Sequence, residues 1–392
     1  MVNFEYYAPT KVVFGKDTEK RTGELAKEFG ATKVLVHYGS SSAKKSGLLD
    51  RVCASLDEAG VSYVTLGGVV PNPRLSLVRE GVKLCREEGV DFLLAVGGGS
   101  VIDSAKAIGY GLYNDCDPWL FFDRKAQAKG CTPLGAVLTI AAAGSEMSSS
   151  CVITNENGWL KRSYGSNYVR CKFAVMNPEL TCSLPPYQTA SGCVDIMMHS
   201  MERFFSHAKA TELTDGICES LIRTVMKQAK VLKEDPTNYD ARAEVMWAGS
   251  LSHNGLTGCG TTGDWATHHI EHELGGMFDV AHGAGLSAVW GSWARYVYRE
   301  EPEKFAQFAV NVCGISPDGK SAEELALEGI CAMEDYFRSI DMPTSLSELG
   351  IHPTDEQMKD MSVKAVFFGR RTLGTFRVLH AEDIEKIYHM AL

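Results

Sequence analysis

Asp91-Phe-Leu-Leu-Ala-Val-Gly-Gly-Gly-Ser100 is the stretch that decides the fold class of this chain of 392 residues. Residues 91–96 form a nearly continuous apolar run, which predicts a strand buried on both faces, and a helix is expected from Val101. Buried strands that alternate with helices are typical of a parallel sheet. Three glycines and Ser100, the expected N-cap, let backbone N–H groups and the positive end of the helix approach a phosphate.

The glycine-rich turn also has a purely structural interpretation. Any tight connection between a strand and a helix favours glycine, and this turn lacks the G-x-G-x-x-G spacing of the Rossmann fingerprint. The turn alone is compatible both with a phosphate-binding loop and with an ordinary turn between a strand and a helix.

The alternation of strands and helices continues on both sides of this turn. Residues 3–14 look strand-like, further strands are expected at Lys33–His37, Tyr63–Leu66 and Leu134–Thr139, and helices at Leu48–Ala59 and Leu75–Glu88. The pair Pro185–Pro186 marks a boundary, because proline cannot continue a helix or a central strand. Helical patterns dominate after it, at Glu212–Lys233, Ala241–Ser252 and Lys304–Val312. We predict an α/β domain with a Rossmann-like parallel sheet over residues 1–185 and an all-helical domain over residues 186–392.

Composition excludes several classes of function. The chain is 45% hydrophobic and 22% charged, as is ordinary for a globular protein, and its net charge of −10 disfavours binding to nucleic acid or to anionic membranes. Its longest apolar run, Leu134–Ala143, is shorter than the roughly 20 residues of a membrane span. The twelve cysteines show no C-x-x-C pair, and the chain does not begin like a signal peptide. These features predict a cytoplasmic protein with reduced thiols.

Histidines are concentrated in one part of the chain. Of 11 histidines, His268, His269, His272 and His282 fall within fifteen positions. Upstream, Asp195 and His199 are spaced i and i+4, which places both on one face of a helix. A single histidine is more often a hydrogen-bonded packing residue than a ligand. A carboxylate with several imidazoles, however, is a ligand set for a divalent ion such as Fe²⁺ or Zn²⁺.

Two other classes of protein also account for part of this pattern. His268-His-Ile-Glu271-His272 fits the H-x-x-E-H motif of inverzincin peptidases, in which the two histidines bind zinc and Glu271 is the general base. That interpretation leaves Asp195, His199 and the glycine-rich turn unexplained. A non-catalytic metal-storage or scaffold protein would explain the histidines but not the turn.

Several motifs, taken together and in this order, resemble the iron-containing (group III) alcohol dehydrogenase family along nearly the whole chain. The matching segments are Gly97–Lys106, Gly144–Glu146, Phe173–Glu179, Gly192–Glu202, His268–Gly275 and Ala281–Gly283. Within the family the chain is most similar to the branch of NADPH-dependent butanol dehydrogenases, on the strength of Tyr38–Gly47 and Pro71–Arg74.

The resemblance implies an architecture, a metal site and a reaction. It implies a dehydroquinate synthase-like fold, and one divalent metal, Fe²⁺ or Zn²⁺, bound by Asp195, His199, His268 and His282. His272 would lie near the substrate without binding the metal, either as a proton shuttle or as a packing residue. The expected reaction is hydride transfer between NADP(H) and a primary alcohol or aldehyde, with a glycerol dehydrogenase-like polyol oxidoreductase as the alternative. Family members commonly dimerise through an N-terminal segment such as residues 3–14, so a homodimer is expected.

The expected coenzyme site has two parts. The resemblance implies that it is lined by Asn72, Gly98, Gly99, Ser100, Asp103, Thr139 and Lys161. The second part follows the first strand at Gly39, Ser40, Ser41 and Ser42, where no carboxylate is present to bind the ribose 2′-OH of NAD. Because the hydroxyls can donate to a 2′-phosphate and Lys44 or Lys45 adds positive charge, the sequence predicts NADP(H) rather than NAD(H).

Overall fold

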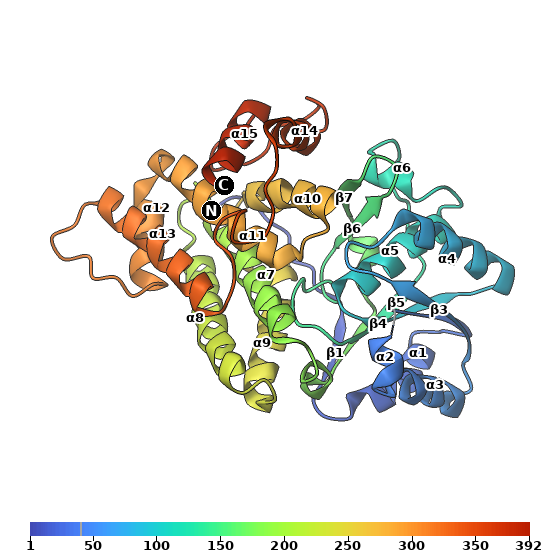
Figure 1. Ribbon diagram of the computed structural model, residues 1–392. Helices are drawn as coiled ribbons and strands as arrows, with labels where there is room; N and C mark the ends of the chain where they lie inside the picture. Colours follow the sequence, from blue (N-terminus) through green and yellow to red (C-terminus); the bar gives the residue numbers. More distant parts are fainter. Residues whose placement is uncertain (40) are drawn as a thin grey trace. The chain divides into compact units, whose positions relative to one another are not determined.

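The computed structural model describes residues 1–39 and 41–392, so Ser40, one of the predicted coenzyme residues, lies outside the described residues. The chain divides into two compact units, which are drawn in Figure 1. One is an α/β unit of residues Tyr7–Ser183, and the other is a helical unit of Leu184–Leu392 together with Met1–Tyr6. The first six residues thus group with the helical unit, because the Val2 N–H donates to the Gly260 carbonyl oxygen at 3.0 Å.

The α/β unit is built on the predicted parallel sheet. Its strand order is β1-β8-β5-β4-β2-β3, and each neighbouring pair is parallel. The strands are β1 (Lys11–Phe14), β2 (Lys33–Gly39), β3 (Ser62–Val69), β4 (Phe92–Gly97), β5 (Leu134–Leu138) and β8 (Phe173–Met176). Every residue of β4 is buried, as its continuous apolar sequence predicted. Only Lys11–Phe14 of the strand-like residues 3–14 forms a strand.

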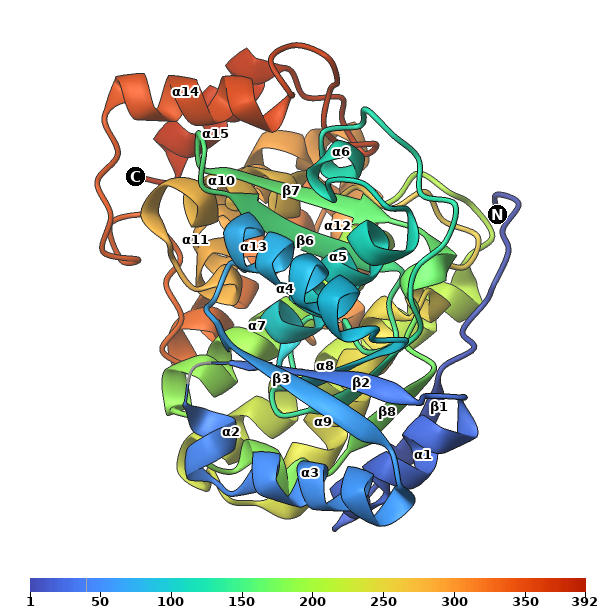
Figure 2. The same cartoon turned by 90° about the vertical axis from the view of Figure 1, so that its right-hand side faces the viewer.

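Helices cover both faces of this sheet, with α1 and α3 on one face and α4 and α5 on the other (Figure 2). The helices of the unit are α1 (Thr22–Glu28), α2 (Ser42–Lys45), α3 (Leu48–Ala59), α4 (Leu75–Glu88), α5 (Gly99–Tyr113) and α6 (Trp119–Phe122). Val36 and Leu94 of the sheet share a core with Leu25 of α1 and Val52 of α3. Burying each such side chain contributes about 1.5–3 kcal/mol.

The α/β unit also contains an antiparallel hairpin that the sequence did not predict. It consists of β6 (Ser150–Asn155) and β7 (Leu160–Gly165), which pair with each other and not with the large sheet. The hairpin packs against α5. Lys161 and Arg162 of β7 are buried, and two adjacent cations hide the alternation that usually identifies a strand.

The second unit is helical, as predicted. Its helices are α7 (Pro186–Phe204), α8 (Glu212–Glu234), α9 (Tyr239–His253), α10 (Ala266–Phe278), α11 (His282–Val297), α12 (Pro302–Asn311), α13 (Ala322–Ser339), α14 (Asp355–Ala365) and α15 (Ala381–Met390). Helix α7 packs against α8, α9 and α11, whereas α10 packs against α11 and α14. The described part of the chain holds no helix that is both long and apolar enough to cross a membrane.

Candidate metal centre and coenzyme loops

Helix α7 provides two of the predicted metal ligands. Asp195 and His199 lie one turn apart, and both side chains are buried. The Nδ1 atom of His199 is 3.4 Å from Oδ1 of Asp195. The i, i+4 spacing therefore places the two groups side by side, as the sequence predicted.

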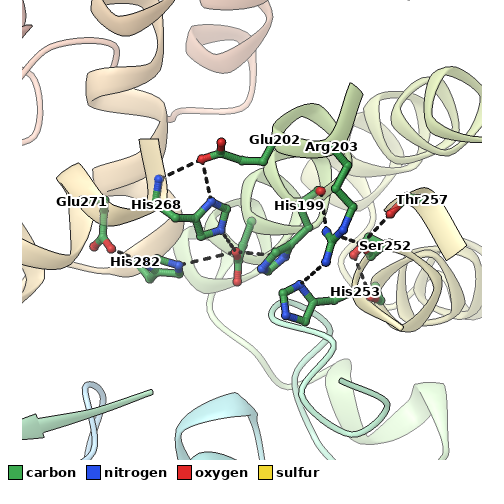
Figure 3. A network of polar contacts seen from close by, with 11 residues as sticks. His199, Glu202, Arg203, Ser252, His253, Thr257, His268, Glu271 and His282 are labelled. Atoms are coloured by element: carbon green, nitrogen blue, oxygen red, sulfur yellow. Dashed lines mark hydrogen bonds and ion pairs between the residues drawn. The ribbon is translucent and has the colours of Figure 1, made fainter. Parts of the chain in front are cut away.

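Helices α10 and α11 bring two more imidazoles to the same carboxylate oxygen (Figure 3). The Nε2 atoms of His268 and His282 are 3.6 Å and 3.7 Å from Oδ1 of Asp195. Ligand atoms of Asp195, His268 and His282 all lie within 4.8 Å of one another. In a tetrahedral site with bonds of about 2.0–2.2 Å, two ligand atoms are separated by roughly 3.3–3.6 Å. The distances from Asp195 Oδ1 to the three imidazole nitrogens are therefore close to those between ligand atoms of a tetrahedral zinc or iron site.

Unsatisfied polar atoms support the same conclusion. Asp195 Oδ1, His199 Nδ1 and His268 Nε2 are buried and have no hydrogen-bond partner among the described residues. Buried polar atoms are normally paired, so three orphans facing one point need a common partner. A divalent cation satisfies all three, and imidazole and carboxylate ligands suit both Fe²⁺ and Zn²⁺. The residues present therefore fit the expected metal.

The pKa values of these histidines differ in direction. Burial, reinforced by the neighbouring His253 and His268, holds the pKa of His199 well below its usual value, so this imidazole is neutral. For His268 burial also acts to lower the pKa, but the neighbouring carboxylates of Asp195 and Glu202 raise it to about 9. Binding of a cation at Nε2 of His268 would therefore release a proton.

Two glycines explain why α11 can bring His282 so close. A Cβ atom on Gly283 would lie 1.9 Å from the carbonyl oxygen of Ser191 on α7, so any larger residue would separate these two helices. A Cβ atom on Gly285 would lie 2.8 Å from Cγ of Glu271. Because glycine has no Cβ atom, these two positions let the backbone of α11 approach α7 and α10 closely.

Four residues beside the ligands were not predicted. Glu202 accepts hydrogen bonds from both the backbone N–H and the ring of His268, and Glu271 contacts Nδ1 of His282. Arg203 donates to the carbonyl oxygen of His199 at 2.6 Å and contacts His253, whose ring centroid is 4.0 Å from that of His199. Glu202 had a usable sequence signal, because it shares the face of α7 with Asp195 and His199 at i+7. Glu271 had a signal only as the possible base of a peptidase motif.

The position of Glu271 argues against the peptidase alternative. In an inverzincin its carboxylate would activate water beside a metal held by His268 and His272. Here that carboxylate contacts the ring of His282 instead. His272 is buried, with its ring centroid 5.8 Å from that of His282, and its role as a proton shuttle stays a prediction.

The predicted coenzyme residues of the α/β unit gather at the carboxyl ends of three strands. Gly39 ends β2, Gly98 and Gly99 follow β4, and Thr139 follows β5, with the Thr139 N–H donating to the carbonyl oxygen of Gly97 at the end of β4 at 3.1 Å. The chain passes from β2 outward to β3 and then back across to β4. Nucleotides bind at such a change of direction in open α/β sheets.

The start of α5 differs from the prediction at one residue. The helix begins at Gly99 with Gly98 as its N-cap, so Ser100 lies in the first turn and is not the cap. A Cβ atom would lie 3.0 Å from Ile140 at Gly98 and 3.0 Å from Ala143 at Gly99, so both glycines also serve close packing.

The remaining predicted coenzyme residues lie in different environments. Ser41 and Ser42 are exposed at the start of α2. Asn72 is buried between two prolines with a left-handed backbone at φ 53°. Lys161 is buried on β7 opposite Thr154.

Asp103 and Lys106 of α5 hold the segment that follows β5. Asp103 accepts hydrogen bonds from the Ser145 hydroxyl at 2.5 Å and from the Val152 N–H at 2.9 Å. The buried ammonium group of Lys106 donates to the carbonyl oxygens of Ser145 and Ser150, each at 2.7 Å. The contacts of Asp103 are thus structural, and they position the loop that contains Gly144-Ser145-Glu146.

Comparison with known protein families gives matches in both units. The family described as iron-containing alcohol dehydrogenase matches residues 9–178, and the C-terminal region of the Fe-containing alcohol dehydrogenase family matches residues 189–392. The chain belongs to the iron-containing alcohol dehydrogenase family. The predicted family and enzyme class are thereby confirmed, and the peptidase and metal-storage interpretations are wrong.

Individual members of the iron-containing alcohol dehydrogenase family resemble the chain over most of its length. It is 42% identical to a probable NADH-dependent butanol dehydrogenase of Bacillus subtilis, with both chains fully covered. It is 35% identical to the NADPH-dependent aldehyde reductase YqhD of Escherichia coli over 90% of each chain. A solved structure of NADH-dependent butanol dehydrogenase A from Thermotoga maritima is 38% identical and superposes with a TM-score of 0.95, covering 99% of this chain and 98% of the other.

Proposed function

We propose that this protein is a metal-dependent oxidoreductase that transfers a hydride between NADP(H) and a primary alcohol or aldehyde. The observation that carries the proposal is the group of three imidazole nitrogens placed 3.4–3.7 Å from one oxygen of Asp195. Asp195, His199, His268 and His282 would hold the divalent metal.

The residues of this chain have separate tasks in the proposed reaction. When bound, the metal supplies a Lewis acid for the substrate oxygen, and the nicotinamide supplies or accepts the hydride. Backbone N–H groups at Gly98 and Gly99 bind the coenzyme phosphates at the start of α5. Lys106 holds the adjoining loop in place through Ser145 and Ser150. His272 donates or accepts the alcohol proton at a ring nitrogen, a role that imidazole commonly has in general acid–base catalysis.

The names of relatives support the substrate class. Relatives 37–42% identical to this chain are named butanol dehydrogenases, and another is named an aldehyde reductase. A relative 30% identical is named 1,3-propanediol dehydrogenase, so diols belong among the candidates to be tested. We infer that short primary alcohols and their aldehydes are the substrates.

The experiment that tests this proposal combines metal analysis with an activity panel. The purified protein is analysed for Fe and Zn, and loss of NADPH or NADH absorbance is followed with short aldehydes, glycerol and 1,3-propanediol. We expect about one divalent metal per chain and the highest kcat/KM for an aldehyde. A protein that binds no divalent metal, or that oxidises only polyols, would overturn the proposal.

The preference for NADP(H) rests on the residues after β2. Exposed Ser41 and Ser42 can donate to a 2′-phosphate, and the exposed Lys44 and Lys45 add positive charge. None of the described residues from Tyr38 to Lys45 is a carboxylate. The names of relatives divide, since four are called NADH-dependent, one NADPH-dependent and one NADP-dependent, and a kinetic comparison of the two coenzymes tests the preference.

We further infer that the protein is a cytoplasmic homodimer. Its twelve cysteines are all free, which suits a reducing compartment. Phe4 and Tyr7 are about half exposed, and they precede β1 at the edge of the sheet. Exposed aromatic side chains next to an edge strand favour association with a second copy of the chain.

A further inference from the structure

Two glutamate carboxylates contact candidate metal-ligating histidines without being among the four predicted ligands. Glu202 and Glu271 are both buried, at 2% and 0% exposure. Each of them contacts Nδ1 of one ligand histidine (Figure 3), whereas Nε2 of the same ring is the atom nearer to Asp195. Burying a carboxylate costs free energy, and the contact with a histidine offsets part of that cost. The question is what these two buried carboxylates do for the histidines.

The contacts determine which ring nitrogen of each histidine carries the proton. Oε1 of Glu202 lies 3.0 Å from Nδ1 of His268 and also accepts the backbone N–H of that residue at 2.9 Å. Oε2 of Glu271 contacts Nδ1 of His282. An ionised carboxylate can only accept, so Nδ1 of both histidines is the donor. Once a cation displaces any proton on Nε2, the lone pair of each Nε2 is directed to the point shared with Asp195.

Each glutamate belongs to a different helix from the histidine it contacts. Glu202 of α7 holds His268 of α10, and Glu271 of α10 holds His282 of α11. The two hydrogen bonds therefore connect three helices in series. They fix the rotation of each imidazole relative to a helix that carries another part of the site.

His199 provides an internal contrast. Its Nδ1 faces Asp195, its carbonyl oxygen accepts from Arg203, and its ring packs against His253. Among the described contacts of His199, none is to Glu202 or Glu271. The two glutamates therefore act on two of the three histidines.

We propose that Glu202 and Glu271 are positioning residues that set the affinity of the centre for its divalent cation by holding His268 and His282 with Nε2 directed at the cation. The proposal rests on the proposed metal centre. It gives a new role to Glu271, which the sequence presented only as the possible base of a peptidase. Carboxylates that orient ligand histidines typically account for about 10–100-fold in metal affinity.

The test measures metal affinity rather than turnover. The full chain is stripped of metal, and its affinity for Zn²⁺ and Co²⁺ is measured by competition with a chromophoric chelator for Glu202→Gln, Glu271→Gln and the double variant. Glu334→Gln is the matched control, because it removes another largely buried carboxylate, one paired with Arg295 of α11. The absorption spectrum of bound Co²⁺ reports the geometry of the site, and thermal unfolding of the metal-free proteins reports stability.

We expect each single variant to bind Zn²⁺ about 10–100-fold more weakly than the unmodified chain. The two losses should multiply in the double variant, since the glutamates act on different histidines. The Zn²⁺ affinity of Glu334→Gln should stay within about twofold of that of the unmodified chain, which we expect to bind Zn²⁺ tightly. Unchanged affinity in both single variants, or an equal loss in Glu334→Gln, would overturn the inference. Failure of the unmodified chain to bind metal would instead refute the proposed function.

Discussion

The buried histidine of the coenzyme unit offers a quantitative test of the structure. His37 lies on β2, and its Nδ1 donates to the carbonyl oxygen of Leu66 at 2.8 Å. Its Nε2 therefore accepts from the hydroxyl of Ser104 on α5, at 2.9 Å. Burial lowers the pKa of His37 to about 4, although the hydrogen bond to Leu66 acts to raise it. The ordinary value of about 6.5 applies to the unfolded chain.

The sign of the pH effect follows from these two values. Between pH 6.5 and pH 4 the unfolded chain takes up a proton at His37 that the folded chain does not, so acid favours unfolding. The contribution of neutral, buried His37 to the free energy of unfolding is therefore fully present well above pH 6.5 and is lost as the pH falls towards 4. At pH 5 the loss amounts to about 2 kcal/mol, and its limit below pH 4 is about 3 kcal/mol.

The assay compares the unmodified chain with His37→Gln by urea unfolding at pH 7.5 and pH 5.0, with metal removed. Glutamine can donate to Leu66 and accept from Ser104, but it does not titrate. We expect the stability advantage of the unmodified chain to shrink by about 2 kcal/mol between the two pH values. The exposed His352 serves as a control, and His352→Gln should show little such change. A pH-independent difference between the unmodified chain and His37→Gln would refute the reasoning.

Three further predictions concern the metal, the coenzyme and the assembly. His282→Ala should lose most bound metal and activity but keep its helical circular dichroism, because the ligand lies at the start of α11; full retention of metal would contradict the assignment. Gly39→Asp should lower kcat/KM for NADPH about tenfold by repulsion of the 2′-phosphate, and a Cβ atom fits there at 3.6 Å from the Val69 oxygen. Better kcat/KM with NADH in the unmodified chain would show the coenzyme argument to be wrong. Light scattering should give twice the 42.8 kDa of one chain, and a stable species of one chain would count against a dimer.

Most of the fold could be predicted because its signals are local. Helices α3 and α4 occupy the predicted residues, since each has an apolar face at helical spacing and ends before a glycine. The hairpin of β6 and β7 could not be predicted in this way. Its strand β7 buries Lys161 and Arg162, and only tertiary packing can make a buried pair of cations acceptable.

The candidate site also contains one part that local sequence signals predict and one part that depends on tertiary packing. Asp195 and His199 are one helical turn apart, so their proximity follows from local geometry. Glu271 shows the limit of local patterns. It fits a five-residue peptidase motif, yet its partner is His282, eleven positions further along the chain and on another helix. Which residue a buried carboxylate contacts depends on helix packing, which no short motif encodes.

The shared face of α7 makes the site sensitive to the length of the chain as well as to its chemistry. Asp195, His199 and Glu202 occupy successive turns of this one helix. Each residue of an α-helix advances the chain by about 100° around the axis. One residue inserted between Asp195 and His199 would rotate Asp195 away from the imidazoles while leaving all four ligands present in the sequence. Insertions and deletions within this turn should therefore abolish metal binding as completely as replacement of a ligand.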